Sequence, residues 1–161
     1  MSKNHWETQP RKKNGQFSNR YESNFMKNIF KSVRKDLTDK DIKNISRGGS
    51  YGFLRNITSG NNLLEIHHMP ANVSSTLSRW KGPCIIMSKE DHTKTSSYKN
   101  SKAAVKYRKW QAKLISEGKF LEAEFMDIKN IRRKFGNKYD KSIDEKIDYE
   151  KSLISEGIIN G

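Results

Sequence analysis

Hydrophobic residues near the start of the chain recur at helical spacing. Phe25, Ile29 and Val33 lie four positions apart, which predicts a first helix. Thr38 and Asp41 have the spacing of a capping box, so a second helix should start within "LTDKDIKNI". We therefore interpret residues 21–47 as a helical N-terminal segment.

Three further helical stripes follow after residue 100. Glycines end the first two, and the third runs from Asp140 to Gly157. We expect these helices to pack through their apolar stripes, with the aromatic members in the core rather than free to stack on bases. The stripe residues are Ala103, Tyr107, Trp110 and Leu114, then Leu121, Phe125, Ile128, Ile131 and Phe135, then Ile143, Ile147 and Ile154.

Residues 53–98 have a different pattern, with short apolar runs bounded by Gly, Asn, Ser and Pro. The runs "FLRNI", "NLLEIHHM" and "GPCIIMS" predict strands, and "RGGSYG" at 47–52 predicts a turn or hinge. Ser88 is a candidate N-cap with Asp91 three positions on, so a helix should begin near Lys89. The local order is strand, loop, strand, helix, and the expected fold class is α+β.

Composition and charge limit the classes of partner that the protein is expected to bind. The formal net charge of +14 and a pI near 9.9 produce a positive potential that attracts polyanions, nucleic acid first. Residues 1–20 carry five Lys or Arg against Glu7 alone, and we interpret them as a basic flexible arm, either a solvated leader or a phosphate contact. We expect no membrane partner, because no run of about 18 apolar residues and no signal-peptide pattern is present.

A single cysteine, Cys84, excludes an internal disulfide and a cysteine-rich zinc site. Nothing in the chain therefore indicates an oxidising compartment. The expected location is the cytoplasm.

The candidate chemistry lies in the histidines. Imidazole both binds divalent metals and accepts protons near neutral pH. His67 and His68 would point to opposite faces of a regular strand, but Pro70 makes the chain turn there. His92, in the first turns of the following helix, would then meet the pair. A purely structural role for these imidazoles is the alternative.

Polar neighbours of His92 extend this candidate site. Asp91 could add an oxygen ligand, although its capping position already accounts for it. Thr95 and Ser96 lie three and four positions beyond His92, on its expected helix face, where they could orient a phosphate or a metal-bound water.

Three segments of the chain resemble a known family. "EIHHMPAN", "GPCIIMSKEDHTKTSS" and "FMDIKNIRRKFGNKYDKSIDEKIDY" are similar to nuclease domains at the C-termini of bacterial polymorphic toxins, within the HNH and endonuclease VII, or His-Me finger, superfamily. The similarity runs from about Gly48 to about Tyr149. It implies an HNH-like nuclease domain over residues 48–161, with a ββα-metal core and flanking helices at both ends.

The resemblance also implies roles for the candidate residues. His67 matches the family's metal ligand, His68 its general base and His92 its helix ligand. Which of the first two is base and which is ligand stays open. The implied cofactor is one divalent ion, Mg²⁺ first, with Mn²⁺, Ni²⁺ or Zn²⁺ as alternatives. Lysines near the motif are candidate phosphate contacts, with a solvated surface position as the alternative; these are Lys89, Lys94 and Lys99.

The function that follows is hydrolysis of phosphodiester bonds, most simply by a DNA endonuclease. An RNase, a non-catalytic nucleic-acid-binding or regulatory protein that keeps the fold, and a structural metal site are the alternatives. The family and the charge imply an acidic immunity or inhibitor protein as a partner, and action inside a target or host cell. One departure is Gly82-Pro83, which stands where many HNH proteins have an asparagine before the second strand.

Overall fold

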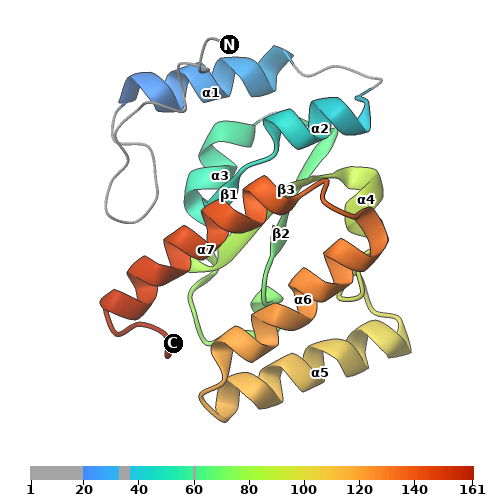
Figure 1. The fold of residues 1–161 in the computed structure, drawn as a ribbon, viewed down its shortest axis with the longest axis vertical. Helices are drawn as coiled ribbons and strands as arrows, with labels where there is room; N and C mark the ends of the chain where they lie inside the picture. Colours follow the sequence, from blue (N-terminus) through green and yellow to red (C-terminus); the bar gives the residue numbers. More distant parts are fainter. Residues whose placement is uncertain (1–19, 33–36, 60) are drawn as a thin grey trace.

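A computed structural model describes residues 20–32, 37–59 and 61–161. The described residues form seven α-helices, two short 3₁₀-helices and one three-stranded antiparallel sheet (Figure 1), which confirms the α+β class. The arm predicted for residues 1–20 lies outside the described residues except for Arg20, and so does Val33. Within the described part of the chain, no helix is long and apolar enough to cross a bilayer.

The elements follow one another from α1 near the N-terminus to α7 near the C-terminus. The predicted strand, loop, strand and helix are confirmed, as are three helices after residue 100. In chain order the elements are α1 (Arg20–Ser32), α2 (Asp39–Ile45), β1 (Gly48–Ser50), α3 (Tyr51–Thr58), β2 (Leu64–His68), the 3₁₀-helices η2 (Asn72–Ser74) and η3 (Arg79–Lys81), β3 (Pro83–Ser88), α4 (Lys89–Thr93), α5 (Lys102–Ser116), α6 (Phe120–Phe135) and α7 (Asp140–Ser155).

β3 is the central strand of the sheet, in the order β1-β3-β2. Its side chains alternate between two apolar clusters, because successive residues of a strand face opposite sides. Cys84 and Ile86 pack with residues of α1, α3 and β2, whereas Ile85 and Met87 pack with residues of α2, α6 and α7. Helices therefore cover both faces, and α7 packs across β1 and β3 (Figure 1).

The strand predicted at "FLRNI" is wrong, because these residues lie in α3. The Ser50 hydroxyl caps this helix by accepting a hydrogen bond from the N–H of Phe53 at 3.2 Å. Tyr51, Leu54 and Ile57 are buried at spacings of three, which is a helical period rather than a strand period. A run of five residues was too short to distinguish the two.

The hinge predicted at "RGGSYG" is also wrong, because Gly48 to Ser50 form the buried strand β1. A side chain at Gly48 would collide with the backbone carbonyl of Ser142 in α7 and would lie 2.7 Å from the backbone nitrogen of Lys146. The glycine thus allows α7 to lie directly on β1. This contact places α7 against the sheet and holds β1 at its edge.

The helical stripes predicted the helices but not all of their buried faces. Leu114, Ile128 and Ile131 are buried as expected, but Trp110 is 52% exposed and Phe125 50% exposed. Polar residues occupy part of the inward faces of the helices instead, because they form hydrogen bonds and ion pairs with one another there. The further exceptions are Ala103, which is exposed, and Phe25, which is 41% exposed.

This polar cluster lies between α5, α6 and α7. Lys146 is fully buried and forms ion pairs with Glu124 and, at 2.8 Å, with Glu150. Asp127 accepts hydrogen bonds from Tyr107 at 2.9 Å and Gln111 at 2.6 Å. We call these six residues the α5–α7 cluster.

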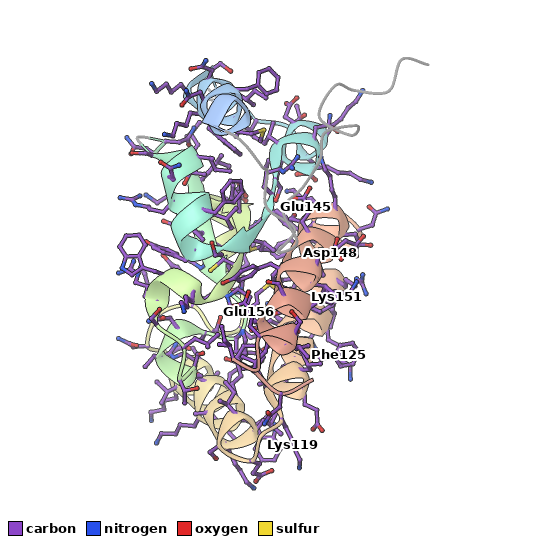
Figure 2. The ribbon with its side chains drawn as sticks, turned by 90° about the vertical axis from the view of Figure 1, so that its left-hand side faces the viewer. Lys119, Phe125, Glu145, Asp148, Lys151 and Glu156 are labelled. Atoms are coloured by element: carbon purple, nitrogen blue, oxygen red, sulfur yellow. The ribbon has the colours of Figure 1, made fainter. Side chains whose placement is uncertain are left out.

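The outer face of α7, by contrast, is an ordinary solvated surface. Figure 2 shows Asp148 and Lys151 on this outer face, where they form an exposed ion pair at 3.0 Å. One side of α7 therefore carries polar residues exposed to water, and the other carries polar residues that are buried and paired.

Candidate functional site

The structure brings His67, His68 and His92 to one cavity of about 430 Å³. A second cavity of about 230 Å³ adjoins it, and Ile66, His68 and His92 line both. The histidines come from the end of β2 and from α4, which are joined through β3. The convergence expected from the sequence is therefore present, and we call the two spaces together the histidine cavity.

His67 points an unsatisfied nitrogen into the interior. Its side chain is only 3% exposed, and its Nε2 has no hydrogen-bond partner among the described residues. Its ring lies 5.0 Å from the ring of His92, edge to face. Burial holds the pKa of His67 well below its usual value, and the nearby His92 and His68 lower it further, so the imidazole is neutral. The unpartnered nitrogen of a neutral imidazole can bind a metal.

His92 is oriented by a carboxylate. Its Nδ1 forms a hydrogen bond with Glu65, and the Tyr98 ring packs edge-on against it at 5.1 Å. Since Nδ1–H donates to the carboxylate, Nε2 is left to accept or to bind a metal, as in carboxylate–histidine–metal arrangements. Glu65 lies two positions before His67 on β2, and alternation places both on the same face of the strand.

His68 is held between an aromatic ring and a carbonyl. Its ring stacks on Tyr51 at 4.9 Å, and its Nε2 lies 3.1 Å from the carbonyl oxygen of Arg79. A carbonyl only accepts, so Nε2 carries the proton and Nδ1 carries the lone pair. Burial lowers the pKa of His68, the hydrogen bond to Arg79 partly offsets this, and the charges of Arg79 and His92 lower it further. The ring is therefore a neutral base.

Gly82 leaves room for the ring of His68. A Cβ at this position would lie 2.7 Å from Cδ2 of His68, closer than atoms pack. The Gly82 carbonyl accepts from the N–H of Tyr51 at 2.9 Å, and Tyr149 in α7 donates to the neighbouring Lys81 carbonyl at 2.8 Å. The segment before β3, which has Gly82 in place of the asparagine of many HNH proteins, is thus tied down by other groups.

His67 and His92 are the two imidazoles of the cavity that would hold a divalent metal. The free Nε2 of His67 and the carboxylate behind His92 are both features of metal-binding histidines. In the described part of the chain no group of three or more His, Cys, Asp or Glu side chains is placed to hold a metal. An ion bound here would take its remaining ligands from water and from phosphate.

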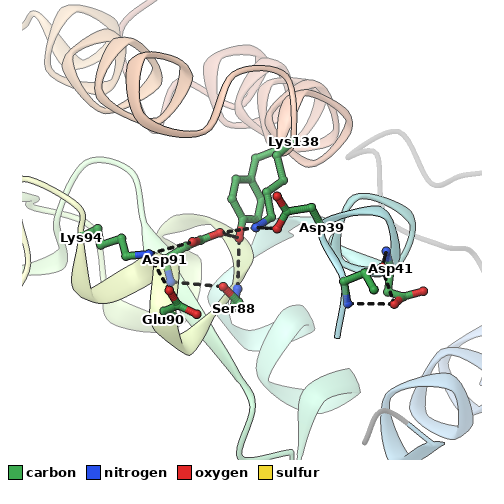
Figure 3. Close-up of polar contacts among 9 residues, drawn as sticks. Asp39, Asp41, Ser88, Glu90, Asp91, Lys94 and Lys138 are labelled. Carbon is green, nitrogen blue, oxygen red and sulfur yellow. Dashed lines mark hydrogen bonds and ion pairs between the residues drawn. The ribbon is translucent and has the colours of Figure 1, made fainter. Parts of the chain in front are cut away.

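Asp91 lies apart from this pair, so the expectation that it joins the metal ligands does not match its position. Figure 3 shows its carboxylate between lysines; it accepts from Lys138 at 2.6 Å and from the Tyr139 hydroxyl at 2.7 Å. Burial disfavours its charge, but these hydrogen bonds outweigh that and lower its pKa. Lys138 also binds Asp39 of α2 at 2.6 Å, so these contacts connect α2 and α4 with the residues just before α7.

The lysines predicted to contact phosphate divide between two places. Lys89 and Lys94 line a larger cleft of about 1280 Å³, whose lining includes the other residues of α4 but not His92. Lys94 is paired there with Glu90 at 2.6 Å (Figure 3). Lys99, by contrast, lines the histidine cavity.

The helix face predicted to carry Thr95 and Ser96 is wrong, because α4 ends at Thr93. The Thr95 hydroxyl donates to the His92 carbonyl at 2.9 Å. Ser96 is bound through both its N–H and its hydroxyl to Asn130 of α6, at 2.9 and 2.6 Å. Both residues hold the chain that follows α4 in place.

Sequence reasoning missed several residues that shape the site. Glu65 could have been found from its period-two relation to His67, but Tyr51 and Arg79 have no such signal because they come from other elements. Arg108 of α5 was missed as well; its guanidinium donates to the carbonyls of Ser97, at 2.7 Å, and Lys99. It thereby holds the loop that carries Lys99 at the cavity.

The rim of the histidine cavity is basic. Lys99 and Arg108 line one part of it and Arg55 and Arg79 the other, against the single carboxylate of Glu65. A rim of this charge attracts anions.

Comparisons with known protein families, with curated proteins and with solved structures found no match for this chain. The chemistry of the site is therefore inferred from the residues and their geometry.

Proposed function

We propose that the protein is a metal-dependent nuclease that hydrolyses phosphodiester bonds, with DNA as the favoured substrate. The observation that carries the proposal is that the three histidines differ in which ring nitrogens are hydrogen-bonded and which are available. His67 and His92 offer ring nitrogens to a metal, while His68, held through its Nε2, offers Nδ1 to a proton. The net charge of +14 and the basic rim support a polyanionic substrate.

β2, β3 and α4 follow one another in the order of the ββα-metal core that the sequence resemblance implies. We propose that these elements form such a core, with the metal-ligand role at His67 and His92 and the base role at His68. The hydrogen bond from His68 to Arg79 supports this division, because it leaves the lone pair of a neutral ring free.

His68 would act by taking a proton from water on its Nδ1 as the water oxygen attacks phosphorus. The bond between phosphorus and the leaving oxygen breaks, and the Arg79 carbonyl stabilises the imidazolium through Nε2–H. A divalent ion held by His67 and His92 would stabilise negative charge on the scissile phosphate and the leaving oxygen. Glu65 keeps His92 in the orientation that presents Nε2.

The test is a cleavage assay with supercoiled plasmid, single-stranded DNA and RNA, each with Mg²⁺, Mn²⁺, Ni²⁺ or Zn²⁺. We expect His68→Ala to lower the cleavage rate by about 10²–10⁴-fold, because that is the usual contribution of a general base. Oligonucleotide binding should be nearly unchanged. His67→Ala and His92→Ala should instead weaken metal binding, measured by calorimetry.

Asp91→Asn serves as the matched comparison, because Asp91 was also a candidate ligand. Its position beside Lys138 predicts a loss of thermal stability with metal affinity unchanged. If no ion supports cleavage, or if His68→Ala cleaves as fast as the wild type, the protein is a non-catalytic nucleic-acid-binding protein instead. Faster cleavage of RNA than of DNA would make it an RNase. The acidic immunity partner, the cytoplasmic location and action inside a target cell stay predictions from the sequence.

A further inference from the structure

Trp80 is a large aromatic side chain that the fold leaves exposed beside the histidine cavity. It lies on η3 and is 62% exposed. Its ring meets the Tyr51 ring edge to face at 5.6 Å, and the backbone of Gly52 lies close to it. One side of the indole is therefore supported by protein, while most of its surface faces solvent.

Two contacts connect Trp80 to the proposed base. Tyr51, which Trp80 touches, is the ring on which His68 stacks. Arg79, the residue before Trp80, provides the carbonyl that binds His68. A group resting on Trp80 would therefore lie next to the site where the phosphate is attacked.

The surface around Trp80 is cationic and firmly held. Arg79 donates to the Tyr51 hydroxyl at 2.8 Å, and its guanidinium lies 4.7 Å above the Tyr51 ring. Lys81, the residue after Trp80, is exposed, and Arg55 lines the same part of the cavity as Arg79. An exposed indole among cations is complementary to a nucleotide, which has an aromatic base and an anionic phosphate.

We propose that Trp80 stacks on an unpaired nucleobase of the strand whose phosphate lies at His68, so the site prefers single-stranded or locally unpaired nucleic acid to an intact duplex. This inference rests on the proposed nuclease function. In a duplex the faces of the bases are already covered by their neighbours, so an indole gains a base face only where the strand is unpaired.

Trp110 provides a matched control. It is 52% exposed, close to the value for Trp80, and Lys113 lies 5.0 Å above its ring. It lies two positions from Arg108 on α5, which places it on nearly the opposite face of the helix from the side chain that holds the cavity loop. Trp110 thus tests the effect of an exposed tryptophan away from the site.

The experiment measures binding of fluorescently labelled oligonucleotides of about 12 nucleotides, in EDTA so that no hydrolysis occurs. Single-stranded DNA, single-stranded RNA and duplex DNA are compared for wild type, Trp80→Ala, Trp80→Phe and Trp110→Ala. We expect Trp80→Ala to weaken single-strand binding by roughly tenfold, the usual contribution of one stacked base, and duplex binding by less than about twofold. Trp80→Phe should recover most of the loss.

An abasic scan identifies the stacked base. Removing the base that contacts Trp80 should weaken wild-type binding by the same factor as Trp80→Ala, and should have no further effect on that variant. The DNA and RNA strands show which sugar the site accepts.

The proposal is overturned if Trp80→Ala binds single strands as tightly as the wild type, if it loses single-strand and duplex binding equally, or if Trp110→Ala loses as much. Because the assay needs no cleavage, its outcome is independent of the nuclease test. A protein that fails to cleave in any metal but shows the Trp80 effect would keep the base-stacking site and lose the nuclease assignment.

Discussion

The histidine cavity and the α5–α7 cluster both contain polar side chains removed from water, but they differ in whether the buried polar atoms have partners. In the α5–α7 cluster, Lys146 has two carboxylate partners, and both oxygens of Asp127 accept hydrogen bonds. In the histidine cavity, the Nε2 of His67 is buried with no partner among the described residues. An unpartnered buried nitrogen lowers the free energy of unfolding, so this imidazole costs the fold stability where the α5–α7 cluster does not.

The electrostatic environments of the two regions also differ. Within the α5–α7 cluster, Lys146 and the carboxyl groups are paired or hydrogen-bonded with one another, which stabilises a particular packing of three helices. The histidine cavity contains neutral imidazoles, because burial lowers the pKa values of His67 and His68, and its charges lie at the rim. Mutations in the first region should therefore affect stability, and those in the second should affect activity.

The largest effect is expected from Lys146→Met in the α5–α7 cluster. This change leaves the carboxylates of Glu124 and Glu150 buried without their cation, which should lower the free energy of unfolding by about 3–5 kcal/mol. Urea denaturation measures it. Lys151→Met, on the exposed face of the same helix, should leave the midpoint unchanged. Equal midpoints for the two variants would contradict the assignment of a structural role to Lys146.

Asp127 should make the stability of the α5–α7 cluster depend on pH. Burial raises its pKa from the ordinary value of 3.8 to about 7, and the hydrogen bonds from Tyr107 and Gln111 only partly oppose this. The folded protein therefore binds the proton more tightly than the unfolded chain, so this stability is present below about pH 4 and is lost as the pH rises through 7.

The matched measurement compares the wild type with Asp127→Asn in urea at pH 5 and pH 8. Between these values the free energy of unfolding of the wild type should fall, relative to the variant, by roughly 2–3 kcal/mol. Parallel pH profiles for the two proteins would show that Asp127 does not bind a proton in this range.

Gly82→Ala should affect the histidine cavity without unfolding the protein. The added methyl group would displace the His68 ring, and a displaced base should lower the rate of cleavage by about 10–100-fold. The backbone at Gly82 has a φ of −57°, which alanine adopts without strain. If Gly82→Ala cleaves as fast as the wild type, the ring of His68 does not depend on this space.

His67→Leu should separate stability from function. Leucine removes the unpartnered buried nitrogen, so we expect the free energy of unfolding without metal to rise by about 1 kcal/mol. Stabilisation by added Mn²⁺ should disappear, which a thermal shift assay would show. His68→Leu is the comparison and should gain no stability, since the nitrogen it removes has a partner. A loss of stability in His67→Leu would indicate a structural role for the imidazole.

The smallest effect is expected from the lysines. Lys99 lines the histidine cavity, whereas Lys94 is paired with Glu90 beside the larger cleft. Lys99→Ala should raise the KM for an oligonucleotide by about two- to fivefold and reduce its dependence on salt, because one phosphate contact is lost. Lys94→Ala should leave both unchanged. The opposite result would show that the substrate follows the larger cleft.

Local signals predicted the elements that hold the histidines. β2 and β3 are apolar runs between turn residues, and Ser88 caps α4 as expected, its hydroxyl accepting from the N–H of Asp91 at 3.2 Å. The capping box of Thr38 and Asp41 is likewise confirmed. These features depend on residues only a few positions apart, so the sequence contains them directly.

Features that depend on distant residues could not be predicted. The carboxylate of Asp91 is held by Lys138, 47 positions away, and no local pattern indicates that pairing. The sequence does not distinguish α3 from a strand, because the buried side of α3 depends on packing against α1 and the sheet. Gln111 faces the interior because it donates a hydrogen bond to Asp127, and not because of its place in a hydrophobic pattern.

The hydrogen bond from Tyr149 to the Lys81 carbonyl joins residues 68 positions apart. The segment it secures includes Gly82 and lies next to the ring of His68, and α7 also packs on β1 and β3. A ribosome makes the histidines well before it makes α7. During synthesis, therefore, the nascent chain already contains all three imidazoles while the support beneath one of them is still missing, and the site is completed only after α7 has emerged and docked.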